Sequence, residues 1–124
     1  MNATIAARLD ELRSLRSGWF HARGIAPGNS FIDFVRDGIA SDCMREIAPR
    51  EIIPIVEGGL RLNWFGSGGA VAADIYWPAK IMRVYGVSVL MPFRIAAIGE
   101  FTLPGEWNRA LTSAHRFCMF GRVG

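Results

Sequence analysis

The stretch from Pro54 to Trp64 constrains the fold of this chain more than any other part of its sequence. Pro54 ends a short apolar run, and the Glu-Gly-Gly of residues 57–59 is typical of a tight turn. Leu60, Leu62 and Trp64 then alternate with polar residues, which is the period-two pattern of a half-buried strand. A turn with a strand on each side is a β-hairpin, so this stretch predicts an antiparallel sheet.

Apolar periodicity predicts two helices before the hairpin and further strands after it. The helices are expected over residues 4–15 and 31–45, with Ser30 as the N-cap of the second. Gly38 lies inside that second helix, where we expect a close contact with the sheet. Strands are expected over 47–54, 60–65, 70–77 and 81–89. This order predicts an α+β fold in which two N-terminal helices pack on one face of a 4–5-stranded antiparallel meander sheet.

The sequence changes character after Tyr85. Residues 87–98 are apolar without a clear period, 101–103 resemble a fifth strand, and 105–115 resemble a short helix. We therefore expect one domain over residues 1–124, with a helix-helix-meander core over 1–85 and a divergent C-terminal extension over 86–124. The sequence does not indicate where this extension lies.

Composition and charge favour a globular chain and disfavour several classes of partner. Of the 124 residues, 51% are apolar and 20% are charged, which is enough apolar material for one core. The net charge is +3 and basic residues are scattered, so nucleic-acid binding is not favoured, although Arg61 and Arg83 would be its candidates. The N-terminus lacks a signal-peptide pattern and residues 84–99 are too short to span a bilayer, so we expect a cytoplasmic protein without membrane contact.

The cysteines and histidines do not predict a cofactor, a metal site or a catalytic residue. Cys43 and Cys118 belong to no CxxC pair, and we expect free thiols in a reducing compartment. His21 and His115 are the only histidines. His115 lies three residues before Cys118, which is a geometrically possible Cys-His nucleophile, but a surface histidine near a buried cysteine is the favoured interpretation.

Paired carboxylates occur at helical spacing in and just after the second predicted helix. Asp33 and Asp37, and again Asp42 and Glu46, are four residues apart and could in principle split their pKa values for acid-base chemistry. A solvated helix face with nearby arginines is the favoured interpretation. The glycine-rich turns at 58–59 and 66–69 lead into strands and not into a helix N-terminus, so they predict hairpins and not phosphate loops.

Polar side chains on the predicted strands indicate a candidate surface. Arg61, Asn63, Asp74 and Tyr76 alternate with core residues and should lie on the outer sheet face, with Trp77 there or at its edge. An open sheet face of this kind can bind a protein, a ligand or a nucleic-acid strand. The alternative, equally favoured, is that the C-terminal segment covers this face. The apolar tail over 117–120 is a second candidate surface.

These motifs together resemble a group of small, uncharacterised bacterial proteins. The shared text is a leucine-rich helix, Gly18-Trp19, a second helix, the Pro-x-x-Glu-Gly-Gly-Leu-x-Leu-x-Trp hairpin of 54–64, and Asp-Ile-Tyr at 74–76. The resemblance covers about residues 9–85. It departs from the group at Asn63, where glutamate is usual, and at residues 20–21, where Asp-Gly usually follows the first tryptophan. The group implies no known activity, substrate or cofactor.

The sequence therefore favours a non-enzymatic interaction or binding module that associates with itself or with another protein. Self-association would give a homodimer. The alternative is a small-molecule-binding domain or weak enzyme with a pocket between helices and sheet, lined by Trp19, Phe34 and Trp64. The candidate ligand or partner residues are Trp19, Arg61, Asn63, Trp64, Asp74, Tyr76 and Trp77.

Overall fold

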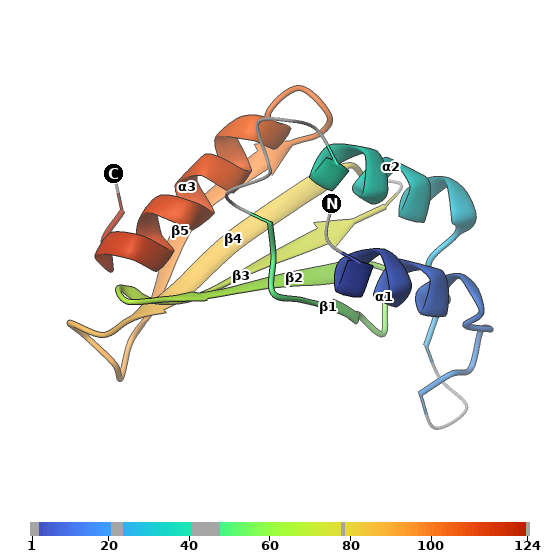
Figure 1. Ribbon diagram of the computed structural model, residues 1–124, viewed down its shortest axis with the longest axis horizontal. Helices are drawn as coiled ribbons and strands as arrows, with labels where there is room; N and C mark the ends of the chain where they lie inside the picture. Colours follow the sequence, from blue (N-terminus) through green and yellow to red (C-terminus); the bar gives the residue numbers. More distant parts are fainter. Residues whose placement is uncertain (1–2, 21–23, 41–47, 78, 124) are drawn as a thin grey trace.

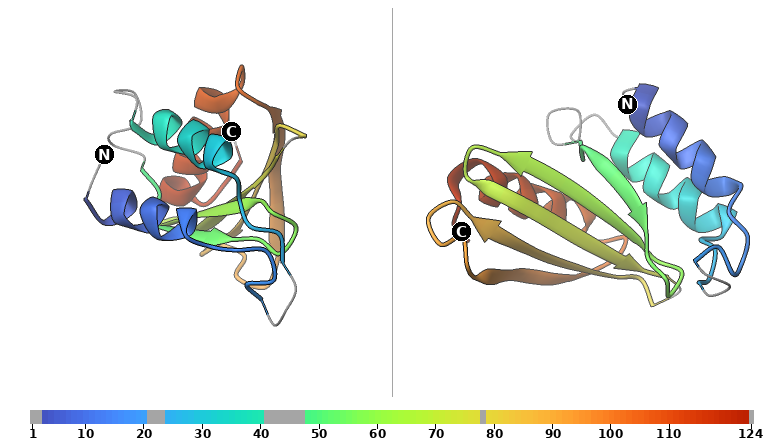
Figure 2. Two further views of the ribbon diagram at one scale, coloured as in Figure 1. Left: turned by 90° about the vertical axis from the view of Figure 1, so that its right-hand side faces the viewer. Right: turned by 90° about the horizontal axis from the view of Figure 1, so that it is seen from below.

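A computed structural model describes residues 3–20, 24–40, 48–77 and 79–123 of the chain, and it shows one sheet with helices on one side. The elements in chain order are α1 (Ala3–Arg13), α2 (Asn29–Ala40), β1 (Glu51–Pro54), β2 (Leu60–Gly66), β3 (Gly69–Tyr76), β4 (Ile81–Ser88), β5 (Ile95–Thr102) and α3 (Trp107–Phe120). Each strand is antiparallel to the next in the order β1-β2-β3-β4-β5. All three helices lie on the same face of this sheet (Figures 1 and 2). The predicted α+β architecture is confirmed.

The C-terminal third of the chain completes the sheet and its cover. The strand expected over 101–103 is the end of an eight-residue β5, and the helix expected over 105–115 continues to Phe120. Residues 86–124 therefore contribute the last strand and the last helix to the same core as the preceding residues. Because α3 packs on β2, β3, β4 and β5 from the inner side, it leaves the outer sheet face open.

Two predicted helix ends differ from the structure. α1 ends at Arg13, two residues before the expected Leu15, and α2 begins at Asn29. Ser30 therefore lies within the first turn of α2 and is not the residue before it, so its assignment as N-cap was wrong. The C-terminal part of the predicted second helix, 41–45, lies outside the described residues.

The core is built where the inner strand residues meet the three helices. α1 supplies Ile5, Leu9 and Leu12, at the i, i+4, i+7 spacing of one helix face. α3 supplies a stripe of six buried side chains, and the strands supply alternate residues. The largest fully buried side chains are Phe31, Phe117, Ile5, Leu9, Leu12, Ile32, Ile52, Leu60, Leu62, Ile75 and Met82.

Two glycines allow α3 to approach its neighbours closely. A Cβ at Gly86 of β4 would lie 2.6 Å from Cε1 of Phe117, so only glycine admits that ring against the sheet. A Cβ at Gly38 of α2 would overlap the indole ring of Trp107. The close contact expected at Gly38 is therefore with α3 and not with the sheet. The sequence did not indicate this partner, because it predicted only a short helix after residue 105.

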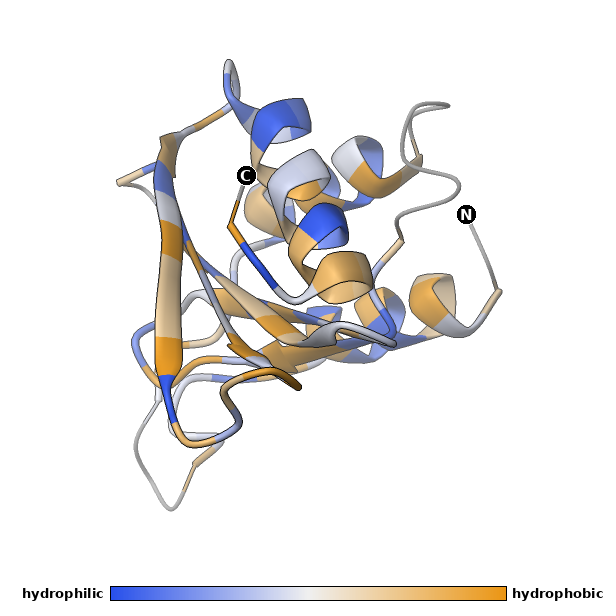
Figure 3. Cartoon of the chain, turned by 90° about the vertical axis from the view of Figure 1, so that its left-hand side faces the viewer, coloured by the Kyte–Doolittle hydropathy of each residue, from blue (hydrophilic) through white to orange (hydrophobic). Residues whose placement is uncertain are grey.

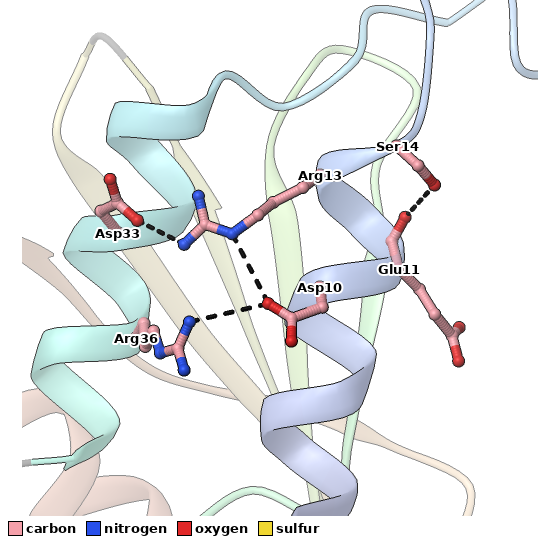
Figure 4. Close-up of polar contacts among 6 residues, drawn as sticks. All are labelled: Asp10, Glu11, Arg13, Ser14, Asp33 and Arg36. Atoms are coloured by element: carbon pink, nitrogen blue, oxygen red, sulfur yellow. Dashed lines mark hydrogen bonds and ion pairs between the residues drawn. The ribbon is translucent and has the colours of Figure 1, made fainter.

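An ion-pair network joins α1 to α2 (Figure 4). Arg13 pairs with Asp33 of α2 and, at 3.7 Å, with Asp10 of its own helix. Arg36 of α2 approaches the same Asp10 oxygen at 3.6 Å. These side chains are partly exposed, so each pair contributes about 1 kcal/mol or less. Asp33 is exposed, as the solvated-face interpretation predicts, but its ion-pair partner is Arg13 of α1, a contact between helices that the sequence did not indicate. Asp42 and Glu46 lie outside the described residues.

The two edges of the sheet differ. β1 is short and ends at Pro54, and α1 lies beside it. Nε of Arg8 donates a hydrogen bond of 2.9 Å to the carbonyl oxygen of Ile52, so a backbone acceptor of this edge is occupied. At the other edge, β5 pairs with β4 on one side, and no described strand pairs with its opposite backbone edge. The β5 edge is therefore the one available to another strand.

Candidate interaction surface

The outer face of the sheet carries a row of four charges with alternating sign. The strand register aligns Arg61 of β2 with Asp74 of β3, then with Arg83 of β4 and Glu100 of β5. We call these four residues the charge row. Directly opposite residues on adjacent strands lie about 4.5–5.5 Å apart. Each charge therefore has an opposite charge as its neighbour, and the row crosses most of the sheet.

Asp74 is the polar centre of this face. Its carboxylate is only 8% exposed and accepts hydrogen bonds from Nε and Nη2 of Arg61 at 2.7 and 3.1 Å. The hydroxyl of Tyr85 donates a third bond to it at 3.0 Å. A buried carboxylate is tolerated when several donors satisfy it. Hydrogen bonds to Asp74 therefore fix the side chains of Arg61 and Tyr85, which come from the two strands on either side of β3.

This arrangement shifts the titration of its members. Hydrogen bonding to Asp74 raises the pKa of Arg61 above its usual value. Burial, followed by the hydrogen bond to Asp74, raises the pKa of Tyr85 to about 12. Burial also raises the pKa of Tyr76. The guanidinium and both phenols therefore stay protonated well above neutral pH.

The outer arginines also lie over aromatic rings. The guanidinium of Arg61 is 5.8 Å from the ring centroid of Tyr85, and that of Arg83 is 5.6 Å from the ring of Tyr76. Nε of Arg83 lies 3.3 Å from Oε1 of Glu100, with both side chains well exposed. The charge row is thus ordered at Asp74 and accessible to solvent toward β5.

A second row on the same face is apolar. The register aligns Phe65, Ala70, Val87 and Ile95 across β2 to β5, and we call them the apolar row. Ile95 is 74% exposed and Phe65 is 48% exposed. Beside the small side chains of this region lies a shallow hollow of about 210 Å³, lined by Phe65, Ala70 and Tyr85 among others. Exposed apolar groups beside a polar centre are typical of an interaction surface.

The structure brings four of the seven sequence-predicted surface residues together. Arg61, Asn63, Asp74 and Tyr76 lie on the outer face, and Nδ2 of Asn63 donates to Oε1 of Glu51 at 3.2 Å. The four come from two neighbouring strands. The alternative in which the C-terminal segment covers this face does not occur, because α3 lies on the opposite face.

The three tryptophans lie elsewhere. Trp64 is buried in the core. Trp77 stacks on Phe31 of α2 at 5.4 Å between ring centroids, and so faces the helices. Nε1 of Trp19 donates to the carbonyl oxygen of Ile25 at 3.2 Å in the loop after α1. Phe34 packs against the rings of Trp77 and Trp107, so its aromatic neighbours in the structure are not the Trp19 and Trp64 that the sequence suggested.

Sequence reasoning missed the apolar row and two polar members of this surface, Tyr85 and Glu100. Tyr85 lies two residues after Arg83 in a strand whose alternation was visible, so the period-two pattern could have identified it. Glu100 was missed because the fifth strand was expected to begin at Phe101. The apolar tail over 117–120, the second candidate surface, is only partly exposed. Phe117 and Cys118 are buried, whereas Met119 and Phe120 are exposed.

The thiol of Cys118 differs from an activated nucleophile. The side chain is buried and unpaired, and this burial raises the pKa of its thiol. Catalytic cysteines need a lowered pKa, so this environment disfavours the thiolate that a Cys-His pair with His115 would use. His21 and Cys43 lie outside the described residues. Among the residues that are described, no three His, Cys, Asp or Glu side chains cluster as metal ligands, and no helix has the length and apolarity to cross a bilayer.

Comparison with known proteins adds no assignment. No protein-family model matches the chain, and no curated protein or solved structure matches it either. The resemblance to the small bacterial proteins with the Pro-x-x-Glu-Gly-Gly hairpin stays a prediction. A function must therefore be argued from the surface itself.

Proposed function

We propose that the chain is a non-enzymatic interaction module that forms a homodimer through its outer sheet face. The observation that carries this proposal is the sign order of the charge row, which reads plus, minus, plus, minus from β2 to β5. A row of this order is complementary to its own reverse. An isologous dimer needs such self-complementarity, because its two-fold axis uses the same surface on both copies. If residue i of one copy contacts residue j of the other, then residue j of the first copy contacts residue i of the second.

A two-fold axis parallel to the strands, midway between β3 and β4, generates the pairing. It places the second copy face to face with the first and reverses the order of its strands. Arg61 then lies opposite Glu100 of the second copy, and Asp74 lies opposite its Arg83. Sheets packed face to face are about 10 Å apart, a distance that long arginine side chains can bridge.

The same axis also matches the other rows. In the apolar row, Phe65 meets Ile95 of the second copy, and Ala70 meets its Val87. Between the rows, the register aligns Ala72 with Tyr85, so each tyrosine lies over an alanine of the opposite copy. Large side chains thus face small ones, which is the basis of interdigitated packing.

The projected area of this face approaches the area that a dimer needs. Five strands about 4.8 Å apart and roughly 24 Å long cover on the order of 500 Å² in projection. The corrugated side-chain surface is larger, and a stable interface buries about 800 Å² per partner.

The proposal places this dimer in the cytoplasm, which the free Cys118 thiol supports because reducing compartments keep cysteines unpaired.

Sedimentation velocity over a range of protein concentrations tests the proposal. The unaltered chain should sediment as a dimer at micromolar concentration. Glu100→Arg places arginine opposite Arg61 of the second copy, and Ile95→Glu places a charge in the apolar row, so both variants should be monomeric. Both positions are exposed, so the variants should keep the unaltered far-ultraviolet circular dichroism.

Phe120→Glu is the matched control. Phe120 is as exposed as these residues but ends α3, on the side away from the outer face. This variant should dimerise like the unaltered chain. A monomeric unaltered chain at all concentrations, or a dimer that Glu100→Arg and Ile95→Glu leave intact, would show that the outer face is not a self-association surface.

A further inference from the structure

A separate pocket of about 470 Å³ lies at the end of the molecule where three chain segments meet. The β2–β3 turn is tied to α3 by a 2.8 Å hydrogen bond from Gly68 N–H to the carbonyl of Cys118. It is tied to the β4–β5 loop by a 2.9 Å bond from Val89 N–H to the carbonyl of Gly68. The pocket lies between that loop, the start of β5 and the residues after α3.

The lining of this pocket is mostly apolar. Its walls are Leu90, Met91, Ile95 and Val123, all exposed, and Ala96 and Phe117 lie deeper. The orange segments of the β4–β5 loop in Figure 3 show this concentration of apolar residues. Clusters of exposed apolar side chains are uncommon on a protein without a ligand or partner for them. The volume lies within the range of small-molecule sites.

Two arginines give the pocket a positive charge. Arg94 and Arg122 line it, and residues 86–99 and 107–123 contain no aspartate or glutamate. Elsewhere the structure pairs Arg8, Arg13, Arg36, Arg61, Arg83 and Arg109 with carboxylates. Within the described ranges Arg94 and Arg122 have no such partner. Their forked donors therefore remain available to an anion.

A buried hydroxyl adds a polar group to the same lining. Ser88 is 7% exposed, and its Oγ accepts a hydrogen bond of 3.0 Å from Leu90 N–H. This bond uses a lone pair and leaves the O–H of Ser88 able to donate. The pocket thus combines an apolar wall with donors for a negatively charged group and contains no acidic side chain.

We propose that this pocket binds a single-chain aliphatic carboxylate of the fatty-acid type. The chain would pack on the apolar lining, and the carboxylate would bind Arg94 and Arg122. A methylene needs roughly 30 Å³, about the liquid volume of a water molecule. A ten-carbon chain therefore fits the space. A second copy of this chain is a poorer occupant, because a two-fold axis here would bring the arginines of both copies together.

Calorimetric titration with decanoate below its micelle concentration tests this proposal. We expect saturable binding with one site per chain, and at least about tenfold weaker binding of decyltrimethylammonium, which has the same chain and the opposite charge. Butyrate, which keeps the head group and loses most of the chain, should not bind measurably. Amide chemical shifts should change at Ser88, Ala96 and Gly121.

Substitutions locate the site. Arg94→Gln and Arg122→Gln should each weaken decanoate binding about tenfold, whereas Arg16→Gln, an equal charge loss on an exposed residue after α1, should leave it unchanged. Ala96→Phe should fill the pocket and abolish binding. Since the arginine variants alter only exposed side chains, they keep the test valid if Ala96→Phe does not fold.

Three results with soluble ligands would overturn the proposal. They are the absence of saturable decanoate binding, equal binding of the cationic amphiphile, and binding that neither arginine variant changes. Binding to vesicles of anionic phospholipid without binding to monomeric decanoate would also refute it, because the exposed loop would then contact a membrane surface. Ile95 belongs to both surfaces, so the pocket is tested only with substitutions at Arg94, Arg122 and Ala96, which lie outside the charge row and the apolar row. Either proposal can therefore fail alone.

Discussion

Replacing Asp74 with alanine tests whether the outer sheet face is organised around one buried charge. The substitution removes two hydrogen bonds from Arg61 and one from Tyr85. Bonds to charged groups contribute about 1.5–3 kcal/mol each and are not additive. Arg61 is 41% exposed, so solvent reduces its share, and the loss of a buried charge recovers part of the desolvation cost. We expect a net loss of about 2–3 kcal/mol.

Urea unfolding followed by tryptophan fluorescence at neutral pH measures this loss. The variants are compared in the Ile95→Glu background, so that dimerisation does not contribute to the free energy of unfolding. A double-mutant cycle between Asp74→Ala and Arg61→Met isolates the pair, and we expect a coupling free energy of about 1–2 kcal/mol.

The pair formed by Arg83 and Glu100 is the internal control for that cycle. It belongs to the same row, but its side chains are 62% and 58% exposed and its contact is 3.3 Å. Its coupling should be below about 0.5 kcal/mol. Equal couplings for the two pairs, or a loss under about 0.5 kcal/mol for Asp74→Ala, would refute the argument that burial of Asp74 organises this face.

Three further measurements test other parts of the structure. Gly38→Ala should destabilise the chain by about 1–3 kcal/mol in chemical unfolding, because overlap with Trp107 outweighs the better helix propensity of alanine; a stabilised variant would contradict that contact. The tyrosinate absorbance of Tyr85, taken as the difference from Tyr85→Phe, should titrate near pH 12. Since this pKa is raised above its unfolded value, the stability it confers should be complete below pH about 10 and lost between about 10 and about 12; a midpoint near 10 would contradict the burial of Tyr85 together with its bond to Asp74. The thiol of Cys118 should react with a disulfide reagent only after unfolding, because it is buried and its pKa is raised; rapid labelling of the native chain at this position would contradict that burial.

Most of the sheet could be predicted from the sequence because its strands are short, alternating and separated by glycine or proline. Leu60, Leu62 and Trp64 alternate cleanly, and the structure buries all three. β5 has a weaker pattern because it is an edge strand with a bulge opposite Val84 and Tyr85, which interrupts the alternation. From the sequence, residues 95–98 were therefore apolar without a period that indicates either a strand or a helix.

The polar half of the candidate surface could also be predicted, whereas its aromatic part could not. Arg61 and Asp74 needed only strand alternation to be placed on one face. Trp77 follows the last residue of β3 and turns toward α2, where it stacks on Phe31. Such a contact depends on how a helix crosses the sheet, which no local pattern encodes. The charge row required the register of four strands and appeared only in the structure.

The difference between the two sheet edges limits how this chain can assemble. One side is closed by α1, by Pro54 and by the bond from Arg8 to the carbonyl of Ile52. A filament grows when every added subunit presents a fresh edge, which requires two open sides. Among the strands that the structure describes, β5 alone has an open edge, so two chains that met edge to edge there would leave their α1-covered sides at both ends. Strand addition would stop at a pair, so the fold carries its own protection against amyloid-like growth.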